Sequence, residues 1–213
     1  CRDSSGRSVT AMRLAITSGE PAGIGPDLCL RLAEQSWQDE LVVLCDQKLL
    51  AARAKEMGVE VSFRRYDANE PVRASQRGAL TVCDIQSRAD VITGVLNPIN
   101  SDYVIALLDR AIAGCGSGEF AAMVTAPLHK EALSAAGAPY NQFPGHTEML
   151  QAAAALHWGK SVADVPVRMM LANEELRTVL VSIHTSLRNA IDAVTFDNVL
   201  QTLLITHGAL LRV

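Results

Sequence analysis

Aromatic residues are scarce in this sequence of 213 residues, where they make up 4% of the chain. Proteins that bind single-stranded nucleic acid stack the bases on aromatic side chains, and they usually carry a basic surface. Here 19 basic and 23 acidic residues give a net charge of -4. Both features argue against a nucleic-acid partner.

The sequence also lacks an unbroken apolar run of the roughly 18 residues that a membrane-spanning helix needs, so we expect no membrane insertion. Its five cysteines are widely spaced and form no C-x-x-C motif. Disulfide frameworks and zinc ribbons show tighter patterns. We therefore expect free thiols in a reducing compartment, the cytoplasm.

Hydrophobic residues make up 49% of the chain, which is enough for a substantial core. The polar residues 1–11 are expected to be an extension that precedes the fold. Strands are expected at residues 13–17, 41–45, 59–66, 80–82, 121–125, 167–171 and 178–183, with a turn at residues 173–174 that joins the last two. Helices are expected at residues 27–35, 48–57, 101–114, 149–156 and 197–211, and a further helix is expected to begin near His129. Gly58 is expected to be the C-cap of the helix at 48–57, and Ser101 the N-cap of the helix at 101–114. Alternating strands and helices, with an unbroken apolar run at 41–45, predict an α/β fold with a largely parallel sheet.

A glycine-rich segment, Gly19–Pro26, lies between the first expected strand and the first expected helix. Such a turn can bring backbone N–H groups close to an anionic ligand. Its spacing, G-x-x-x-G-x-G-P, differs from the dinucleotide fingerprint G-x-G-x-x-G, and Asp27 lies where a phosphate would meet the helix. A tight structural turn and a ligand-lining loop both remain open.

The segment Thr125–Lys130 follows an expected buried strand, and ligands of open α/β sheets bind at the carboxyl ends of the strands. Lys130 could contact a phosphate or a carboxylate as a point charge, or it could be a solvated lysine. Further along, Gly145-His146-Thr147-Glu148 could form a compact anion-binding corner. Alternatively, Thr147 and Glu148 simply begin the next helix.

His184 follows the expected strand 178–183, again at an edge where ligands bind. Imidazole is the commonest side-chain metal ligand. A metal site needs three or four donors, and no H-x-x-x-H or C-x-x-C lies nearby. A structural histidine therefore remains an alternative.

Four segments occur together and in order: ITSGEPAGIGPDL, GEFAAMVTAPLHK, PGHTE and MMLANEELRTVLVSIHTSLR. As a set they resemble the 4-hydroxythreonine-4-phosphate dehydrogenase family of vitamin B6 biosynthesis. The resemblance implies a fold like that of isocitrate and isopropylmalate dehydrogenases, with two α/β subdomains around a cleft, in a homodimer. We expect residues 12–125 to form the first subdomain and residues 126–213 to begin the second.

The resemblance also implies an activity. The family oxidises 4-phosphooxy-L-threonine with NAD or NADP, and decarboxylation then gives 3-amino-2-oxopropyl phosphate; a divalent metal such as zinc, magnesium or cobalt is required. His146 and Thr147 match the family's substrate-binding pair, and His184 matches the first of its three metal-binding histidines. Lys130 and the segment Gly19–Pro26 match family segments near the cleft, without an assigned role. No catalytic or cofactor-binding residue is assigned.

The sequence departs from the family in two respects. The family's other metal histidines lie in Asn-Pro-His-Ala-Gly and Tyr-His-Asp-Gln segments, and neither string occurs here. We therefore expect that the C-terminal part of the family's chain is missing and that this chain alone is inactive. A small insertion, Asn141–Phe143, precedes the segment that carries His146. Alternatives are a related dehydrogenase of a four-carbon sugar-acid phosphate or of an aromatic dihydrodiol, and a non-catalytic α/β binding module.

Overall fold

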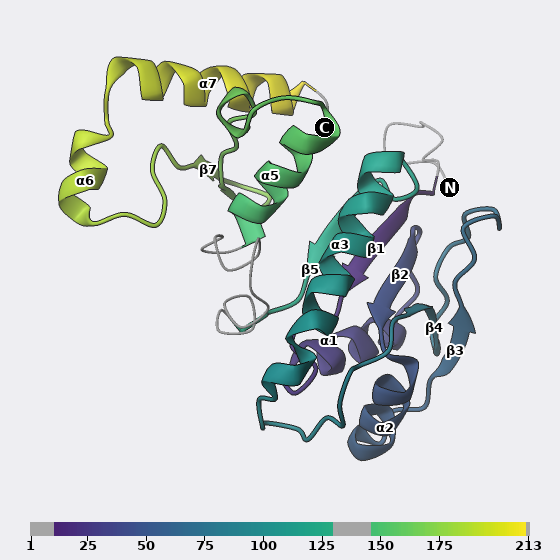
Figure 1. Ribbon diagram of the computed structural model, residues 1–213. Coiled ribbons are helices and arrows are strands. Elements are labelled where there is room, and N and C mark those ends of the chain that lie inside the picture. Colours follow the sequence, from purple (N-terminus) through teal and green to yellow (C-terminus); the bar gives the residue numbers. More distant parts are fainter. Residues whose placement is uncertain (1–10, 130–145, 212–213) are drawn as a thin grey trace. The chain divides into compact units, whose positions relative to one another are not determined.

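The computed structural model describes residues 11–129 and 146–211 (Figure 1). The chain divides into two compact units, residues 1–150 and 151–213, and each unit is described by itself. The boundary expected after residue 125 separates the two subdomains of the family's fold, which is a different division from these compact units, and it stays a prediction.

A parallel sheet of five strands forms the centre of the first unit. The strands are β1 (Arg13–Thr17), β2 (Glu40–Cys45), β3 (Ser62–Arg65), β4 (Ala79–Asp84) and β5 (Ala122–Thr125). Their order is β3-β4-β2-β1-β5, and every neighbouring pair is parallel. The predicted α/β class with a parallel sheet is therefore confirmed.

Helices cover both faces of this sheet (Figure 1). Helices α1 (Gly25–Arg31) and α2 (Gln47–Met57) pack on the face that carries Ile16, Val43 and Val82. Helix α3 (Ser101–Ser117) packs on the opposite face, against Ala15, Val42 and Leu44. All six residues of β2 are buried, as expected for a central strand that is covered on both sides.

The ends of α2 follow from the sequence. The Asp46 carboxylate accepts hydrogen bonds from the N–H groups of Lys48 and Leu49, which would otherwise lack partners in the first turn. Gly58 ends the helix in the left-handed conformation, at a φ of 66°. Glycine adopts this conformation without a steric penalty, so the predicted glycine C-cap is confirmed.

The start of α3 differs from the prediction that Ser101 is an N-cap. Ser101 is the first residue of the helix, and a short 3-10 turn, η2 (Pro98–Asn100), precedes it. The Asn97 side chain caps this turn by accepting a hydrogen bond from the N–H of Ile99, at 3.1 Å. The helix expected at residues 27–35 also changes type, because α1 ends at Arg31 and a 3-10 turn, η1 (Leu32–Glu34), continues it.

Helix α5 (His146–His157) spans the division between the two units. The second unit continues with η4 (Val162–Asp164), β6 (Met170–Ala172), β7 (Arg177–Val179), α6 (Leu187–Asp192) and α7 (Phe196–Leu210). Strands β6 and β7 form an antiparallel pair. The predicted turn at residues 173–174 is confirmed, since the Asn173 side chain accepts the N–H groups of Glu175 and Leu176.

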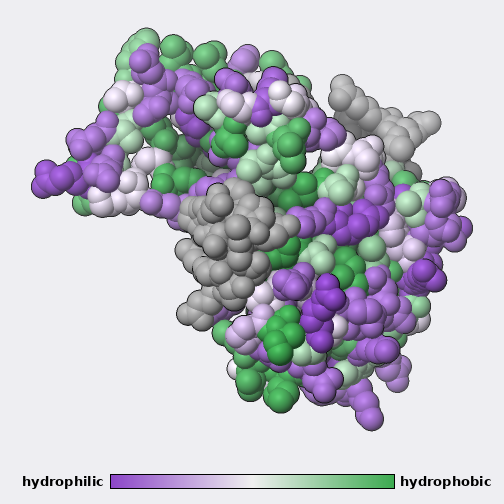
Figure 2. All heavy atoms as spheres, viewed as in Figure 1, coloured by the Kyte–Doolittle hydropathy of each residue, from purple (hydrophilic) through white to green (hydrophobic). Residues whose placement is uncertain are grey.

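Apolar side chains of α7 remain at the surface (Figure 2). Leu203 and Leu204 are 61% and 62% exposed. Within residues 11–129 and 146–211, no helix combines the length and the hydropathy that are needed to cross a membrane. The four cysteines in these ranges, Cys29, Cys45, Cys83 and Cys115, form no disulfide.

Candidate functional site

The order of the strands identifies the edge of the sheet where a ligand is expected. From β1 the chain first moves to β2, and it later returns to place β5 on the other side of β1. In open α/β sheets, ligands bind outside the carboxyl ends of the strands at such a change of direction. The candidate site therefore comprises the segments that follow β1 and β5, together with the starts of α3 and α5.

Two of the segments that the sequence singled out meet at this edge. The N–H of Glu20, in the glycine-rich turn, donates to the carbonyl of Pro127 at 3.1 Å. The N–H of Ala126 donates to the carbonyl of Thr17 at 3.0 Å. Gly19 lies directly beneath this junction at a φ of 67°, and a Cβ added there would be 2.2 Å from the Pro127 oxygen. Only glycine allows the two segments to approach so closely.

The turn is also held by contacts of its own. The Glu20 carboxylate accepts the N–H of Ala22 at 3.1 Å, and the carbonyl of Ala22 accepts the N–H of Gly94 at 2.8 Å. Asp27, in the first turn of α1, forms an ion pair with Arg53 at 2.6 Å. These contacts account for the segment as a tight strand-to-helix turn. A ligand-lining role remains a prediction.

A buried tyrosine of α3, for which no functional role was predicted, ties the helix to the same edge. The Tyr103 hydroxyl accepts the N–H of Asp46 at 3.1 Å and lies 3.2 Å from the Ser18 hydroxyl. It also donates to the sulfur of Cys45 at 3.4 Å. Burial raises the pKa of this hydroxyl, so the group stays protonated. Because Ser18 and Asp46 directly follow β1 and β2, Tyr103 fixes the start of α3 over the ends of both strands.

Four buried polar atoms on the elements of the candidate site have no hydrogen-bond partner among the residues that the structure describes: Thr17 Oγ1, Ser101 Oγ, His146 Nε2 and Glu148 Oε2. They belong to the last residue of β1 and to the first turns of α3 and α5. Buried polar groups in native proteins are nearly always paired, so such atoms often mark a site for a ligand or an ion.

Packing places the first turn of α5 near α3. Met149, one helical turn after His146, belongs to a buried cluster with Ile105 and Leu108 of α3. Leu128, three residues after the end of β5, packs against the same cluster. The first turn of α5, which carries His146 and Glu148, therefore lies against the N-terminal half of α3 and the segment after β5.

His146 and Thr147, the predicted substrate-binding pair, open helix α5, and both side chains are half-buried. Burial lowers the pKa of His146, so its imidazole is neutral near pH 7. A neutral imidazole offers one N–H donor and one acceptor, and the Thr147 hydroxyl offers a second donor. Lys130, Gly145 and the insertion Asn141–Phe143 lie outside the described residues, as does most of the helix expected to begin near His129.

His184, the predicted metal ligand, belongs to the second unit. The strand expected over residues 178–183 ends at Val179, so the prediction that His184 ends a strand is wrong. His184 is exposed instead, in a bend with a φ of 52°. This left-handed conformation is uncommon for a residue with a side chain, and such residues occur often at functional sites. Across residues 11–129 and 146–211, no group of three or more His, Cys, Asp or Glu could hold a metal ion.

Comparison with known proteins identifies the relatives of this chain. The family model for the pyridoxal phosphate biosynthetic protein PdxA matches residues 36–213. The 4-hydroxythreonine-4-phosphate dehydrogenase of Vibrio cholerae is 42% identical over 204 residues, which are 96% of this chain and 58% of the relative. The enzyme of the same name from Citrobacter koseri is 45% identical over 186 residues, which are 87% of this chain and 53% of the relative.

A crystal structure of a 4-hydroxythreonine-4-phosphate dehydrogenase from Burkholderia phymatum superposes with a TM-score of 0.76 at 30% identity. The match covers 95% of this chain and 59% of that structure. The chain thus spans little more than half the length of the relatives it matches. The isocitrate and isopropylmalate dehydrogenase-like fold class is confirmed by this similarity. By its sequence and its fold, the chain belongs to the PdxA family.

Proposed function

We propose that this protein contributes to the oxidation of 4-phosphooxy-L-threonine by NAD or NADP, followed by decarboxylation to 3-amino-2-oxopropyl phosphate. Membership of the PdxA family supports the reaction class. The structural observation that carries the proposal is the buried Nε2 of His146, which has no partner in the described part of the chain. This atom lies in the first turn of α5, which packs against α3, and by the resemblance His146 matches the family's substrate-binding histidine.

His146 and Thr147 would bind the phosphate group of this substrate. Each side chain can donate one hydrogen bond to a phosphate oxygen. Both residues lie in the first turn of a helix of 12 residues, whose dipole favours an anion at this end. The pair therefore orients a phosphorylated substrate. An aromatic dihydrodiol has no phosphate and gains nothing from this pair.

The described residues do not fit a complete metal site, since His184 has no second and third donor among them. We therefore assign no step of the reaction to zinc, magnesium or cobalt. Oxidation of a secondary alcohol releases a hydride, which suits a nicotinamide cofactor. Because the chain belongs to this family, we also propose that the complete enzyme is a homodimer in the cytoplasm.

We expect the 213-residue chain alone to show negligible dehydrogenase activity, because one histidine does not hold a catalytic divalent ion. The test compares this chain, verified by intact mass, with a chimera in which it is extended by the corresponding C-terminal segment of the Vibrio cholerae relative. Formation of reduced cofactor is followed with 4-phosphooxy-L-threonine, NAD or NADP and a divalent metal. Turnover by the chimera alone is the expected result, and metal-dependent turnover by the short chain would contradict it.

The second candidate is a dehydrogenase of a four-carbon sugar-acid phosphate. The same pair, His146 and Thr147, favours it equally, because that substrate also carries a phosphate. The chimera is therefore also assayed with erythronate and threonate phosphates. A higher kcat/KM for either of these compounds would replace the proposed substrate, and inactivity with all three would favour a non-catalytic binding module.

A further inference from the structure

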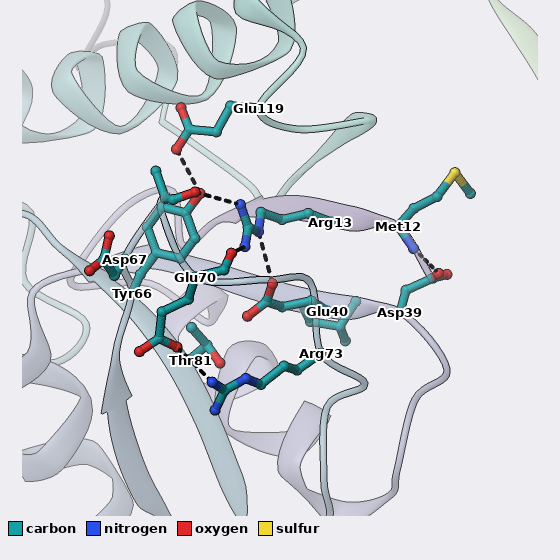
Figure 3. A network of polar contacts seen from close by, with 12 residues as sticks. Met12, Arg13, Asp39, Glu40, Tyr66, Asp67, Glu70, Arg73, Thr81 and Glu119 are labelled. Carbon is teal, nitrogen blue, oxygen red and sulfur yellow. Dashed lines mark hydrogen bonds and ion pairs between the residues drawn. The ribbon is translucent and has the colours of Figure 1, made fainter. Parts of the chain in front are cut away.

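A network of polar side chains lies on the sheet of the first unit (Figure 3). Leu80 and Val82 of β4 pack in the cluster under α1 and α2, so Thr81 between them points to the opposite face. On β3, Arg64 follows Phe63 in the same alternation and faces Thr81. Helix α3 packs on β1, β2 and β5 of this face. Over β3 and β4, the same face of the sheet carries the polar side chains Arg64 and Thr81.

An ion-pair network occupies this position. Glu40, 2% exposed, accepts a hydrogen bond from Arg13 at 2.8 Å and also pairs with Arg64. Glu70 accepts from Arg64 at 3.0 Å and lies 3.6 Å from Arg73. These five side chains comprise three arginines and two glutamates, and the nearby Glu119 is paired with Arg110.

Beside the network is a pocket of about 220 Å³. Its polar lining consists of Arg64, Arg73, Ser75, Gln76 and Thr81, and the remaining lining residues are two alanines and a leucine. None of the lining residues is a carboxylate. Pockets for drug-sized ligands measure roughly 300–1,000 Å³, so this one suits a single small group.

The lining residues have hydrogen-bond donors to offer. Thr81 Oγ1 already accepts from Arg64 at 3.0 and 3.3 Å, and Ser75 Oγ accepts the N–H of Leu41 at 2.9 Å. Both hydroxyls therefore retain a proton for donation. Arg73 is 57% exposed, and its 3.6 Å contact with Glu70 is longer than a normal hydrogen bond. Its planar guanidinium has five N–H donors in a geometry that matches an oxyanion.

We propose that this pocket binds inorganic phosphate, with Arg73 as the principal ligand and the hydroxyls of Ser75 and Thr81 as further donors. The pocket borders β3, β4 and the loop that precedes β4, whereas His146 and Thr147 lie in the first turn of α5, which packs against α3 and does not line the pocket. This binding site is therefore distinct from the candidate functional site and does not depend on the proposed reaction.

The experiment is an NMR titration of the 213-residue chain with inorganic phosphate at constant ionic strength. Arg73→Ala is compared with Arg77→Ala, which removes the same charge from an exposed residue of the same loop that does not line the pocket. Amide signals of residues 73–81 should shift and saturate in the unmodified chain. Arg73→Ala should weaken the affinity about tenfold or more, as expected for a lost charge-assisted hydrogen bond. Arg77→Ala should leave the affinity within about twofold, because it removes only a screened surface charge.

Three results would overturn this inference. One is equal weakening by the two variants, which would indicate a diffuse charge effect. Another is a titration that shifts only the signals of residues 146–148, which would place phosphate at the candidate functional site alone. The third is an absence of saturable shifts. Arg73→Gln, which keeps much of the side-chain stem, should reproduce the effect of Arg73→Ala and so exclude a local folding defect.

Discussion

Substitution of Gly19 by alanine tests the junction on which the candidate site is built. Gly19 has a φ of 67°, and an added Cβ would lie 2.2 Å from the Pro127 carbonyl oxygen. Gly58 is a matched control, because its φ is 66° and no atom lies within 4 Å of an added Cβ. The two variants share the backbone strain, and only Gly19→Ala adds a collision with backbone.

The expected magnitudes follow from these two geometries. A left-handed residue with a side chain costs about 1–2 kcal/mol relative to the right-handed form, which is the whole expected loss of unfolding free energy for Gly58→Ala. An overpacked contact adds about 1–3 kcal/mol. Gly19→Ala should therefore destabilise the first unit by about 2–5 kcal/mol in total.

Urea unfolding measures this difference. The chain has two tryptophans, and Trp37 is packed in the first unit with its Nε1 donating to the carbonyl of Leu32 at 2.9 Å. In a Trp158→Phe background, Trp37 fluorescence reports on that unit alone. Equal losses of stability for the two glycine variants would refute the close approach of the Gly19 turn to Pro127.

Three further predictions concern charge and metal binding. Glu40→Ala should lower the free energy of unfolding by about 3–5 kcal/mol, because it leaves the buried Arg13 cation without its main partner. The double variant Arg13→Met, Glu40→Leu should lose far less stability, because it leaves no buried charge unpaired. Equal losses of stability for the single and the double variant in urea unfolding would contradict this. In the chimera, His184→Ala should abolish metal-dependent turnover with an unchanged circular dichroism spectrum, whereas a loss of soluble protein would indicate a structural histidine. Burial lowers the pKa of His146 below its usual value of 6.5 in the folded chain. At pH values between the pKa of the folded state and 6.5, the folded state therefore binds fewer protons than the unfolded state. The contribution of this group to stability is therefore present above pH 6.5 and is lost as the pH falls through the folded pKa; an NMR titration midpoint at or above 6.5 would contradict this.

Local signals predicted most of the first unit. The apolar run Leu41–Cys45 fixes a central strand, and it corresponds to β2 within one residue. Gly58 is the predicted C-cap of α2. The N-cap at Asp46 was not predicted, although aspartate is typical of that position. Alternation of side chains and capping chemistry act over a few residues, which is why the sequence shows them directly.

Predictions failed where distant residues decide the structure. Ser101 has the chemistry of an N-cap, but the chain is already helical from Pro98, and the Asn100 side chain instead accepts the N–H groups of Arg88 and Ala89. Residues 180–183 are as apolar as a strand, yet the partner strand β6 begins only at Met170, which pairs with Val179, the last residue of β7. A strand needs a partner of matching length, and no local pattern in residues 180–183 reveals where the antiparallel partner begins.

The candidate site shows the same division. Its individual segments could be selected from the sequence, because each combines glycine or histidine with the end of an expected element. The close approach of Gly19 to Pro127 joins residues that are more than 100 positions apart. The Tyr103 hydroxyl joins the start of α3 to Ser18, which follows β1, and to Asp46, which follows β2. Such contacts depend on the order of the strands, which the sequence pattern alone does not specify.

The most direct test of the proposed substrate site is the steady-state kinetics of His146→Ala in the chimera. The account predicts a KM for 4-phosphooxy-L-threonine raised about tenfold or more, as expected for a lost hydrogen bond to a charged group, with kcat largely retained because His146 binds the phosphate and not the reacting carbon. An unchanged KM would contradict the assignment of His146 to the substrate's phosphate.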